Sequence, residues 1–249
     1  MKIDIKSRKG ALTQQQIVMY LVLIAGFLVL LFFIFVLDLG AITNKEICRN
    51  SVILRDKATS IAGELDCRTN YLCISGGEDC EGITATTEVK VDSESKEEIM
   101  KALAEEMSDC WYMFGEDKEL DYTGGPVSTR VECAICSIVK FDEKVQGKFP
   151  TITYLEFYEY LEKTKKDDFQ SYLRYLYGVT DTDSLEIQDQ FKIIDIKNDI
   201  ISTGGKYSII TGIDNNLFDS FDDDEWLKVY IIPTEETSAT SCKDFITKA

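Results

Sequence analysis

Apolar residues run without interruption from Ile17 to Leu37, a stretch of 21 residues that contains no charged side chain. A helix of this length rises roughly 31 Å, about the thickness of the hydrocarbon core of a bilayer. Inside lipid the backbone has to satisfy its own hydrogen bonds, so a single apolar run must be helical. The pattern therefore predicts one transmembrane helix over residues 13–38, with the lipid bilayer as the partner of Ile17–Leu37.

A cleaved secretory signal shares part of this pattern. Its apolar region is usually about 7–15 residues long and is followed by small residues before the cut. Here the run is longer, and the charged residue Asp38 occupies the third position before a cut after Gly40. We therefore expect the helix to remain part of the protein.

The segment before the span, residues 1–12, is a basic leader. Its charged side chains are Lys2, Lys6, Arg8, Lys9 and Asp4. The positive-inside rule places such a leader in the cytoplasm. Of the 27 basic and 44 acidic side chains of the chain, four and one lie in the leader, which leaves 23 basic and 43 acidic beyond it, a net charge of −20. We expect a single-pass cell-membrane protein with a cytoplasmic N-terminus and an extracellular C-terminal domain.

The leader ends in Gly10, and the polar stretch ALTQQQ then leads directly into the apolar run. This arrangement, over about the first 37 residues, resembles the class III signal peptide of archaeal type IV pilin-like proteins, and the layout of the chain is similar to that of membrane-anchored archaeal surface proteins. The resemblance implies a cut between Gly10 and Ala11 that leaves the helix on the mature protein, and self-assembly through that helix. Many pilins have a glutamate at the fifth mature position, where this chain has Gln15, which lacks the charge for pairing with a neighbour. A plain, uncut signal-anchor fits the same residues.

The segment 39–66 contains a second predicted helix. Thr43 and Glu46 form a capping box, and apolar residues recur at three- and four-residue steps up to Leu65. The segment is either a stalk that rises from the membrane or an amphipathic helix of the extracytoplasmic domain.

Residues 67–249 alternate between helical and extended patterns. We predict a cysteine-rich loop over 66–82, helices over 95–114, 153–161 and 169–177, and strands over 83–91, 127–141, 191–196, 206–213 and 226–232. The predicted fold is α+β, an antiparallel sheet of about four to six strands covered by helices.

All eight cysteines lie beyond the predicted span: Cys48, Cys67, Cys73, Cys80, Cys110, Cys133, Cys136 and Cys242. An even number in an oxidising compartment indicates disulfide bonds, although the spacing leaves the connectivity open. Cys110 falls on the buried face of the helix 95–114, and Cys242 is placed to tie down the tail.

Cys133 and Cys136 form the one motif with the spacing of a redox or zinc site. Redox pairs of this kind sit at a helix N-terminus, where the thiol pKa is lowered, whereas these two lie in a predicted strand. Positions three apart in a strand point to opposite faces. We therefore expect two structural disulfides with different partners, and we keep an extracytoplasmic thiol oxidoreductase as the alternative.

Composition narrows the remaining function classes. The chain has no histidine, which removes Ser-His and Cys-His nucleophile pairs, and the sequence predicts no cofactor and no metal site. A domain this acidic is a poor partner for nucleic acid. The six carboxylates over 214–225 form either a solvated loop or a cation site without EF-hand spacing.

Eight tyrosines and phenylalanines lie between Tyr154 and Tyr177. They either pack onto the sheet or form a patch for a protein or glycan partner. The sequence thus favours a membrane-anchored surface protein with a structural or binding role and no enzymatic activity, such as a pilin-like or minor-pilin subunit. A non-assembling signal-anchored receptor or envelope component is the alternative.

Overall fold

The computed structural model describes residues 14–36, 44–57, 65–92, 94–116, 131–187, 194–214, 225–242 and 244–247. The chain divides into two compact units, Met1–Thr43 and Asn44–Ala249. We call the second unit the head. Gly10, Ala11 and the rest of the basic leader lie outside the described residues.

The first unit contains one helix, α1 (Gln14–Val36), of 23 residues. Three glutamines open it, and the residues from Ile17 onward are apolar. The large apolar side chains from Ile17 to Val29 keep between 47% and 66% of their surface exposed. Among the described residues, no helix is both long enough and apolar enough to cross a membrane. In α1 the described side chains are those of residues 16–29.

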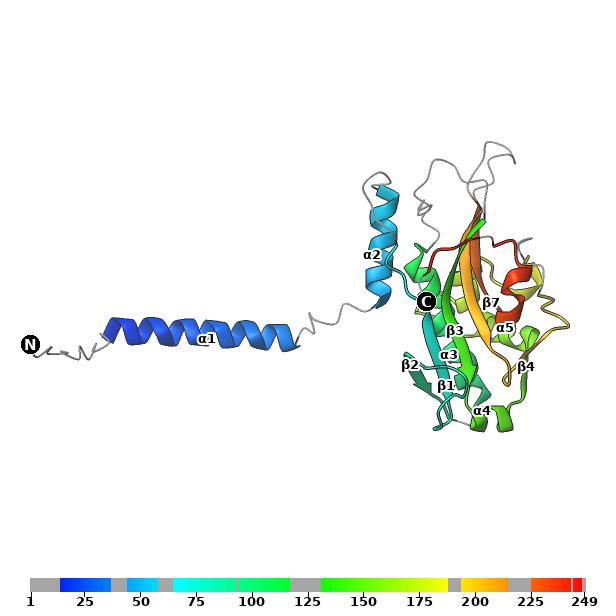
Figure 1. Cartoon of the computed structure of the whole chain (residues 1–249), viewed down its shortest axis with the longest axis horizontal. Helices are drawn as coiled ribbons and strands as arrows, with labels where there is room; N and C mark the ends of the chain where they lie inside the picture. Colours follow the sequence, from blue (N-terminus) through cyan, green and yellow to red (C-terminus); the bar gives the residue numbers. More distant parts are fainter. Residues whose placement is uncertain are drawn as a thin grey trace, which may run out of the picture. The chain divides into compact units, whose positions relative to one another are not determined.

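The head is an α+β unit built on one main sheet (Figure 1). Its strands lie in the order β2 (Thr87–Lys90), β1 (Asn70–Ser75), β3 (Val131–Phe141), β6 (Tyr207–Asp214) and β7 (Glu225–Pro233), and β8 (Asp244–Phe245) also pairs with β3. A separate pair, β4 (Thr151–Thr153) and β5 (Ile200–Ser202), is antiparallel.

The main sheet is mixed, so the predicted antiparallel sheet is wrong. Strands β3, β6 and β7 are antiparallel, but β1 runs parallel to both β2 and β3, and β8 runs parallel to β3. The difference comes from β1, which lies inside the segment predicted to be a cysteine-rich loop. Its sequence NYLCIS is short, and its last four residues are buried, so it lacks the alternation of a half-exposed strand.

Two strands share one edge of β3. Strand β1 pairs with the second half of β3, from Ser137 to Phe141, and β8 pairs with Glu132 and Cys133 in the first half. Between them the carbonyl of Ile135 accepts from the Thr69 hydroxyl at 2.9 Å, and its N–H donates to Oγ1 of Thr247 at 3.1 Å. Two threonine hydroxyls therefore complete the hydrogen bonding where the two strands meet.

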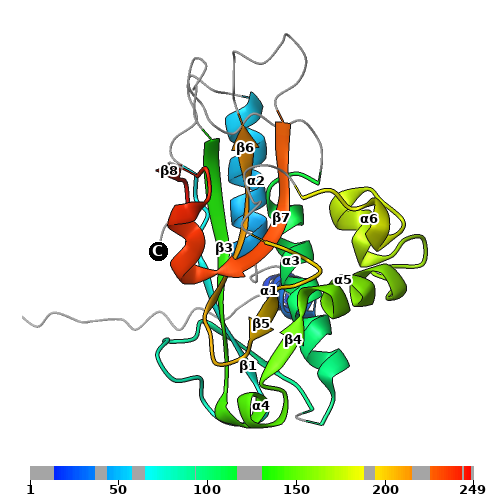
Figure 2. The same ribbon diagram turned by 90° about the vertical axis from the view of Figure 1, so that its right-hand side faces the viewer.

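Helices cover the sheet and the β7 edge (Figure 2). They are α2 (Asn44–Lys57), α3 (Lys96–Met113), α4 (Glu143–Lys148), α5 (Tyr154–Lys163) and α6 (Tyr172–Tyr177), with 3-10 turns η1 (Thr182–Ser184) and η3 (Thr234–Ala239). Helix α3 contacts β3, β6 and β7, and α2, α5 and α6 pack against α3.

Helices α3 and α5 both begin at a side-chain N-cap. The hydroxyls of Ser95 and Thr153 accept from the N–H groups of Glu98 and Glu156, which satisfies free amides in the first turns of α3 and α5. The buried face of α3 predicted to contain Cys110 is confirmed, and it consists of Ile99, Leu103, Met107, Cys110 and Trp111, with Phe114 just beyond the helix.

Local hydrogen bonds account for the other differences from the predicted elements. The predicted helix 169–177 begins only at Tyr172, after the cap Ser171. Of the predicted strand 191–196, residues 191–193 lie outside the described residues and residues 194–196 form no strand; the Asp195 carboxylate accepts from the N–H of Lys197 and closes a turn there. Helix α2 is described as far as Lys57, residues 58–64 lie outside the described residues, and Leu65 is not helical.

Candidate functional site

The eight cysteines form four disulfide bonds, which confirms the prediction of disulfides. The pairs are Cys48–Cys67, Cys73–Cys80, Cys110–Cys136 and Cys133–Cys242. Each joins two different segments of the head, and none of the cysteines is free. The sequence predicts that these cysteines form disulfide bonds, but it does not predict which cysteines pair.

Cys133 and Cys136 bond to different partners, as their place in a strand predicts. The β3–β6 register shifts between Ile135 and Ser137, so Cys136 lies at a bulge opposite no residue of β6. It reaches Cys110 on α3, whereas Cys133 reaches the C-terminal segment at Cys242. All four sulfurs are in buried or half-buried residues. The motif therefore forms two structural crosslinks, with no bond between its own cysteines.

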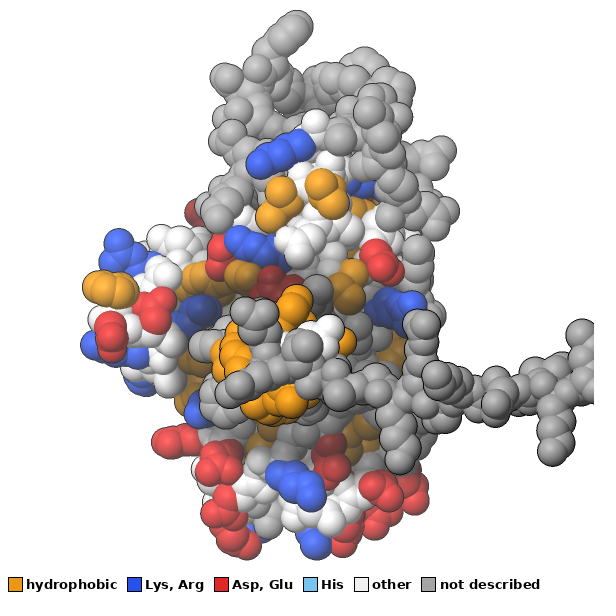
Figure 3. Space-filling model, turned by 90° about the vertical axis from the view of Figure 1, so that its left-hand side faces the viewer, with side chains coloured by type: hydrophobic (Ala, Val, Ile, Leu, Met, Phe, Trp, Pro, Cys, Tyr) orange, Lys and Arg blue, Asp and Glu red, His pale blue; other side chains and the backbone are white. Residues whose placement is uncertain are grey.

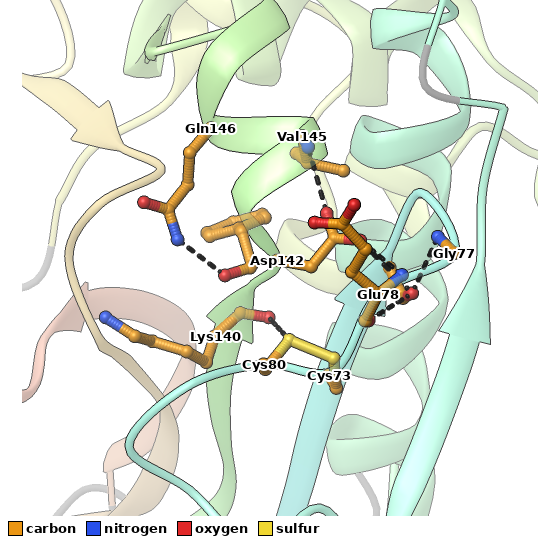
Figure 4. Close-up of a disulfide and its surroundings, with 10 residues drawn as sticks. Cys73, Gly77, Glu78, Cys80, Lys140, Asp142, Val145 and Gln146 are labelled. Atoms are coloured by element: carbon orange, nitrogen blue, oxygen red, sulfur yellow. Dashed lines mark hydrogen bonds between the residues drawn. A yellow bond between two sulfur atoms is a disulfide. The ribbon is translucent and has the colours of Figure 1, made fainter.

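The Cys73–Cys80 bond closes the loop that follows β1, and a buried carboxylate holds the same loop (Figure 4). Asp142, at the end of β3, is fully buried. Its Oδ1 accepts from the N–H of Val145 at 2.9 Å and caps α4, while its Oδ2 accepts from the N–H of Glu78 at 2.9 Å. The loop is thus fixed at two independent points.

The disulfide bond and the hydrogen bond to Asp142 together explain how β1 and β2 can lie side by side in parallel. Residues 76–86 are the whole connection between them, although parallel neighbours usually need a crossover of about a dozen residues or more, often a helix. Gly77 takes φ +114°, a conformation that favours glycine, and donates its N–H to Oγ of Ser75 at 2.9 Å. The chain can therefore change direction sharply at Gly77.

The tip of this loop is acidic. Glu78, Asp79 and Glu81 are exposed, and acidic side chains predominate at the lower end of the face in Figure 3. Among the described residues no group of three His, Cys, Asp or Glu side chains is arranged to hold a metal ion. The predicted carboxylate-rich loop over 214–225 lies outside the described residues, apart from its two ends.

A polar contact fixes α2 to α3. The guanidinium of Arg49 lies 3.8 Å from the centre of the Tyr112 ring and donates to the Tyr112 carbonyl at 2.6 Å and to Oε2 of Glu116 at 3.3 Å. The Tyr112 hydroxyl donates to Glu46 at 3.1 Å. Desolvation, and then this hydrogen bond to Glu46, raise the pKa of the Tyr112 hydroxyl. The Cys48–Cys67 bond links α2 covalently to the segment that precedes β1.

The aromatic segment 154–177 is mainly core, which confirms packing for most of its rings. Five rings are buried and two are half-buried: Tyr154, Phe157, Tyr158, Tyr172 and Tyr177, then Tyr160 and Tyr175. The eighth ring, Phe169, is 90% exposed.

Two of the buried tyrosines bond to the edge strand β7. The Tyr154 hydroxyl donates to the carbonyl of Ile231 at 2.9 Å, and the Tyr177 hydroxyl donates to the carbonyl of Val229 at 2.5 Å. Because the Tyr177 proton is used in this way, the Tyr158 hydroxyl, 3.1 Å away, donates to the Tyr177 oxygen. Burial raises the pKa of all three hydroxyls.

The turn between α5 and α6, residues 163–171, holds Phe169 in the solvent; we call it the Phe169 turn. Oδ1 of Asp167 accepts from the N–H of Phe169 at 2.8 Å and of Gln170 at 3.0 Å. The bond from Phe169 is the main cause that lowers the pKa of the Asp167 carboxyl. The Lys166 N–H donates to the Gln170 carbonyl at 3.0 Å. Sequence reasoning missed this turn because Phe169 was assigned to a helix.

The chain matches no protein-family model, no curated protein and no solved structure.

Proposed function

We propose that this chain is a single-pass membrane-anchored surface protein whose disulfide-bonded head has a structural or binding role outside the cytoplasm. The observation that carries the proposal is the surface of α1. Its large apolar side chains are exposed on every side of the helix from Ile17 to Val29. A helix that is apolar all round is stable where apolar groups surround it, in a bilayer or among other helices, and is unstable alone in water.

The chemistry of the head supports the oxidising side of the membrane. Four disulfides that use every cysteine are typical of proteins exposed to oxidising conditions and rare in the cytosol. The four basic side chains of the leader agree with the positive-inside rule for this orientation.

Alkaline extraction of membranes from cells that express the full chain tests the anchor. We expect the protein to remain in the pellet. Replacing Leu23 and Leu28 together by lysine should release it, because a lysine at the centre of a span costs about 3 kcal/mol. Replacing the same two residues by isoleucine is the matched control and should leave the protein in the membrane. Recovery of the unaltered chain in the soluble fraction would overturn the proposal.

Within this proposal we favour a pilin-like subunit, on the sequence around Gly10 and Ala11. This subunit begins at Ala11 after processing, whereas a signal-anchored receptor or envelope component begins at Met1 or Lys2. Mass spectrometry of the N-terminus of the purified protein separates the two. A start at Met1 would leave the anchor intact and remove the pilin-like assignment.

The thiol oxidoreductase alternative makes a different prediction. It requires Cys133 and Cys136 to cycle through free thiols, whereas the proposed structural role requires both to stay in disulfides. Alkylation of the folded protein without reductant should therefore add no label. Labelling of either residue would favour the oxidoreductase.

A further inference from the structure

The outer side of α2 carries a stripe of exposed residues. Four of them follow one another at steps of three and four positions, so they share one face of the helix: Ile47, Asn50, Leu54 and Lys57. The two apolar members, Ile47 and Leu54, keep 36% and 62% of their surface exposed. We call these four residues the α2 stripe. Figure 1 shows α2 on the outside of the head, beside the sheet.

The α2 stripe is held in a fixed position on the head. Cys48 and Val52 are the buried residues of the helix. Cys48 bonds to Cys67, and Arg49 binds the Tyr112 carbonyl of α3 at 2.6 Å. Since both attachments lie away from the stripe, Ile47 and Leu54 are presented to the outside without any rearrangement of the helix.

The charge of the α2 stripe differs from that of the chain around it. Beyond the leader, 23 basic and 43 acidic side chains give a net charge of −20, whereas the stripe contains Lys57 and no carboxylate. Glu46, which lies beside the stripe, accepts from the Tyr112 hydroxyl at 3.1 Å. Asp56 and Arg55 are both half-buried, and at 100° per residue Asp56 lies on the opposite side of the helix from Ile47.

The charged side chains that neighbouring segments bring to α2 balance one another. Two carboxylates of α3 meet α2, and each is paired with a cation of α2. The pairs are Lys45–Asp109 and Arg49–Glu116. Asp66 and Arg68, in the segment that precedes β1, are exposed and have opposite charges. The face around the α2 stripe is therefore one that an anionic surface does not repel.

The connection to α1 determines which surface lies within reach of α2. Seven residues, 37–43, separate the two helices. Even fully extended, the eight steps from Val36 to Asn44 cover at most about 28 Å. Val36 is one residue from the end of the apolar run that forms the proposed span. The membrane is thus close to α2 in every copy, and a short tether gives even a weak contact a high effective concentration.

We propose that the α2 stripe lies on the membrane that holds α1. Ile47 and Leu54 enter the boundary between the headgroups and the acyl chains, as the apolar face of an interfacial helix does, and Lys57 extends its ammonium group into the headgroups. The inference rests on the proposed membrane anchor. It adds that the head is held against the membrane surface through α2 as well as through the chain that connects it to α1.

Photocrosslinking to lipid tests this contact. The purified full chain is reconstituted into vesicles of phosphatidylcholine and phosphatidylglycerol, with the photoreactive residue p-benzoylphenylalanine in place of Leu54. After illumination we expect lipid adducts at this position, detected by mass spectrometry. The same residue in place of Ile200, which is 49% exposed on β5, is the control and should give no adduct. The partner strand of β5, β4, lies across the head from α2 in Figure 1.

The photoreactive residue in place of Val22, which is 66% exposed on α1, separates the two proposals. Adducts at position 22 without adducts at position 54 would overturn the inference and leave the anchor standing. Adducts at neither position would show that the anchor itself is wrong. Equal adducts at positions 54 and 200, or a crosslink from position 54 to protein instead of lipid, would also overturn the inference.

Adding one carboxylate to the α2 stripe gives a second test. Asn50→Asp keeps the size of the side chain, and it should lower the yield of lipid adducts at position 54 about fivefold, because a negative charge then faces the anionic headgroups. Ser238→Asp, at an exposed position of η3, adds the same charge elsewhere on the head and should leave the yield unchanged. Equal yields in the two variants would contradict the proposal.

Discussion

The buried residue Asp142 connects several segments of the head through hydrogen bonds. Its carboxylate is fully buried and accepts hydrogen bonds from Val145, Glu78 and Ser75, which belong to α4, the β1–β2 loop and the end of β1. Buried polar groups are costly when their partners are lost. Asp142 therefore joins the start of α4 to the end of β1 and its loop, which lie 67 and 64 residues away in the sequence.

We expect Asp142→Ala to lower the free energy of unfolding by about 2–4 kcal/mol, because it leaves the N–H groups of Val145 and Glu78 without an acceptor and removes the cap of α4. Urea unfolding, followed by circular dichroism of the full chain in detergent, measures the change. Asp79→Ala, on the exposed tip of the same loop, is the control and should shift the free energy by less than about 0.5 kcal/mol. Equal effects of the two substitutions would contradict the role given to Asp142.

The buried tyrosine hydroxyls predict how stability depends on pH. Burial raises the pKa of Tyr154, Tyr158 and Tyr177 above the value of about 10 that they have in the unfolded chain. Their contribution is therefore complete below pH 10 and is lost as pH rises, because only the unfolded state releases these protons. Each group should lower the free energy of unfolding by about 1.4 kcal/mol per pH unit above pH 10, and the three together by about 4 kcal/mol.

Urea unfolding at pH 8 and at pH 11 measures this slope. Tyr158→Phe should make the slope shallower by about 1.4 kcal/mol per pH unit, since it removes one titrating hydroxyl and keeps the bond from Tyr177 to Val229. Equal stability at the two pH values would show that the hydroxyls ionise as easily in the folded head as in the unfolded chain.

Among the elements, those with a strong periodic pattern and a cap were predictable. Helix α3 has 18 residues, an apolar stripe and the cap Ser95, and each of these signals is local. Strand β1 was not predictable, because its six residues are held by pairing with β2 and β3, which lie later in the sequence. The exposed Phe169 was missed for a similar reason: an aromatic residue suggests burial, and only the Asp167 turn keeps this one in solvent.

The disulfide bonds were likewise predictable only in part from the sequence. Separate partners for Cys133 and Cys136 were predictable, because positions three apart in a regular strand point to opposite faces. That the partners are Cys242 and Cys110 depends on the path of the chain around the sheet. The spacing of the cysteines along the sequence does not determine that path.

Helix α2 gives a prediction at the scale of one element. Replacing Cys48 and Cys67 by serine should cost about 3 kcal/mol, because the bond closes a 19-residue separation. Arg49 should still hold α2 on α3, so the loss of protection in hydrogen–deuterium exchange should be confined to α2 and its neighbours. Asn50→Ala, at an exposed position of α2, is the control and should leave exchange unchanged. Faster exchange throughout the head would show that the disulfide stabilises the whole head and not α2 alone.

On the scale of the whole molecule, the disulfides differ in how much chain they restrain. Cys133–Cys242 spans 109 residues and joins the C-terminal segment to β3, whereas Cys73–Cys80 spans seven residues and joins β1 to the loop that follows it. In the chain-entropy account a bond restrains the unfolded state more when its loop is longer. The long bond should therefore stabilise the head more than the short one, whose loop Asp142 also holds.

We expect Cys133→Ser with Cys242→Ser to cost about 5 kcal/mol, and Cys73→Ser with Cys80→Ser about 2.5 kcal/mol at most. The second cost should be the smaller because Asp142 still binds the N–H of Glu78 and keeps the short loop closed. Urea midpoints of the two variants and the unaltered chain, all in detergent, give the order, and complete unfolding of the first variant also agrees with it, since a domain is stable by only about 5–15 kcal/mol. If the short bond proved the more important, the β1–β2 connection would depend on its disulfide, and the buried carboxylate would be too weak to replace it.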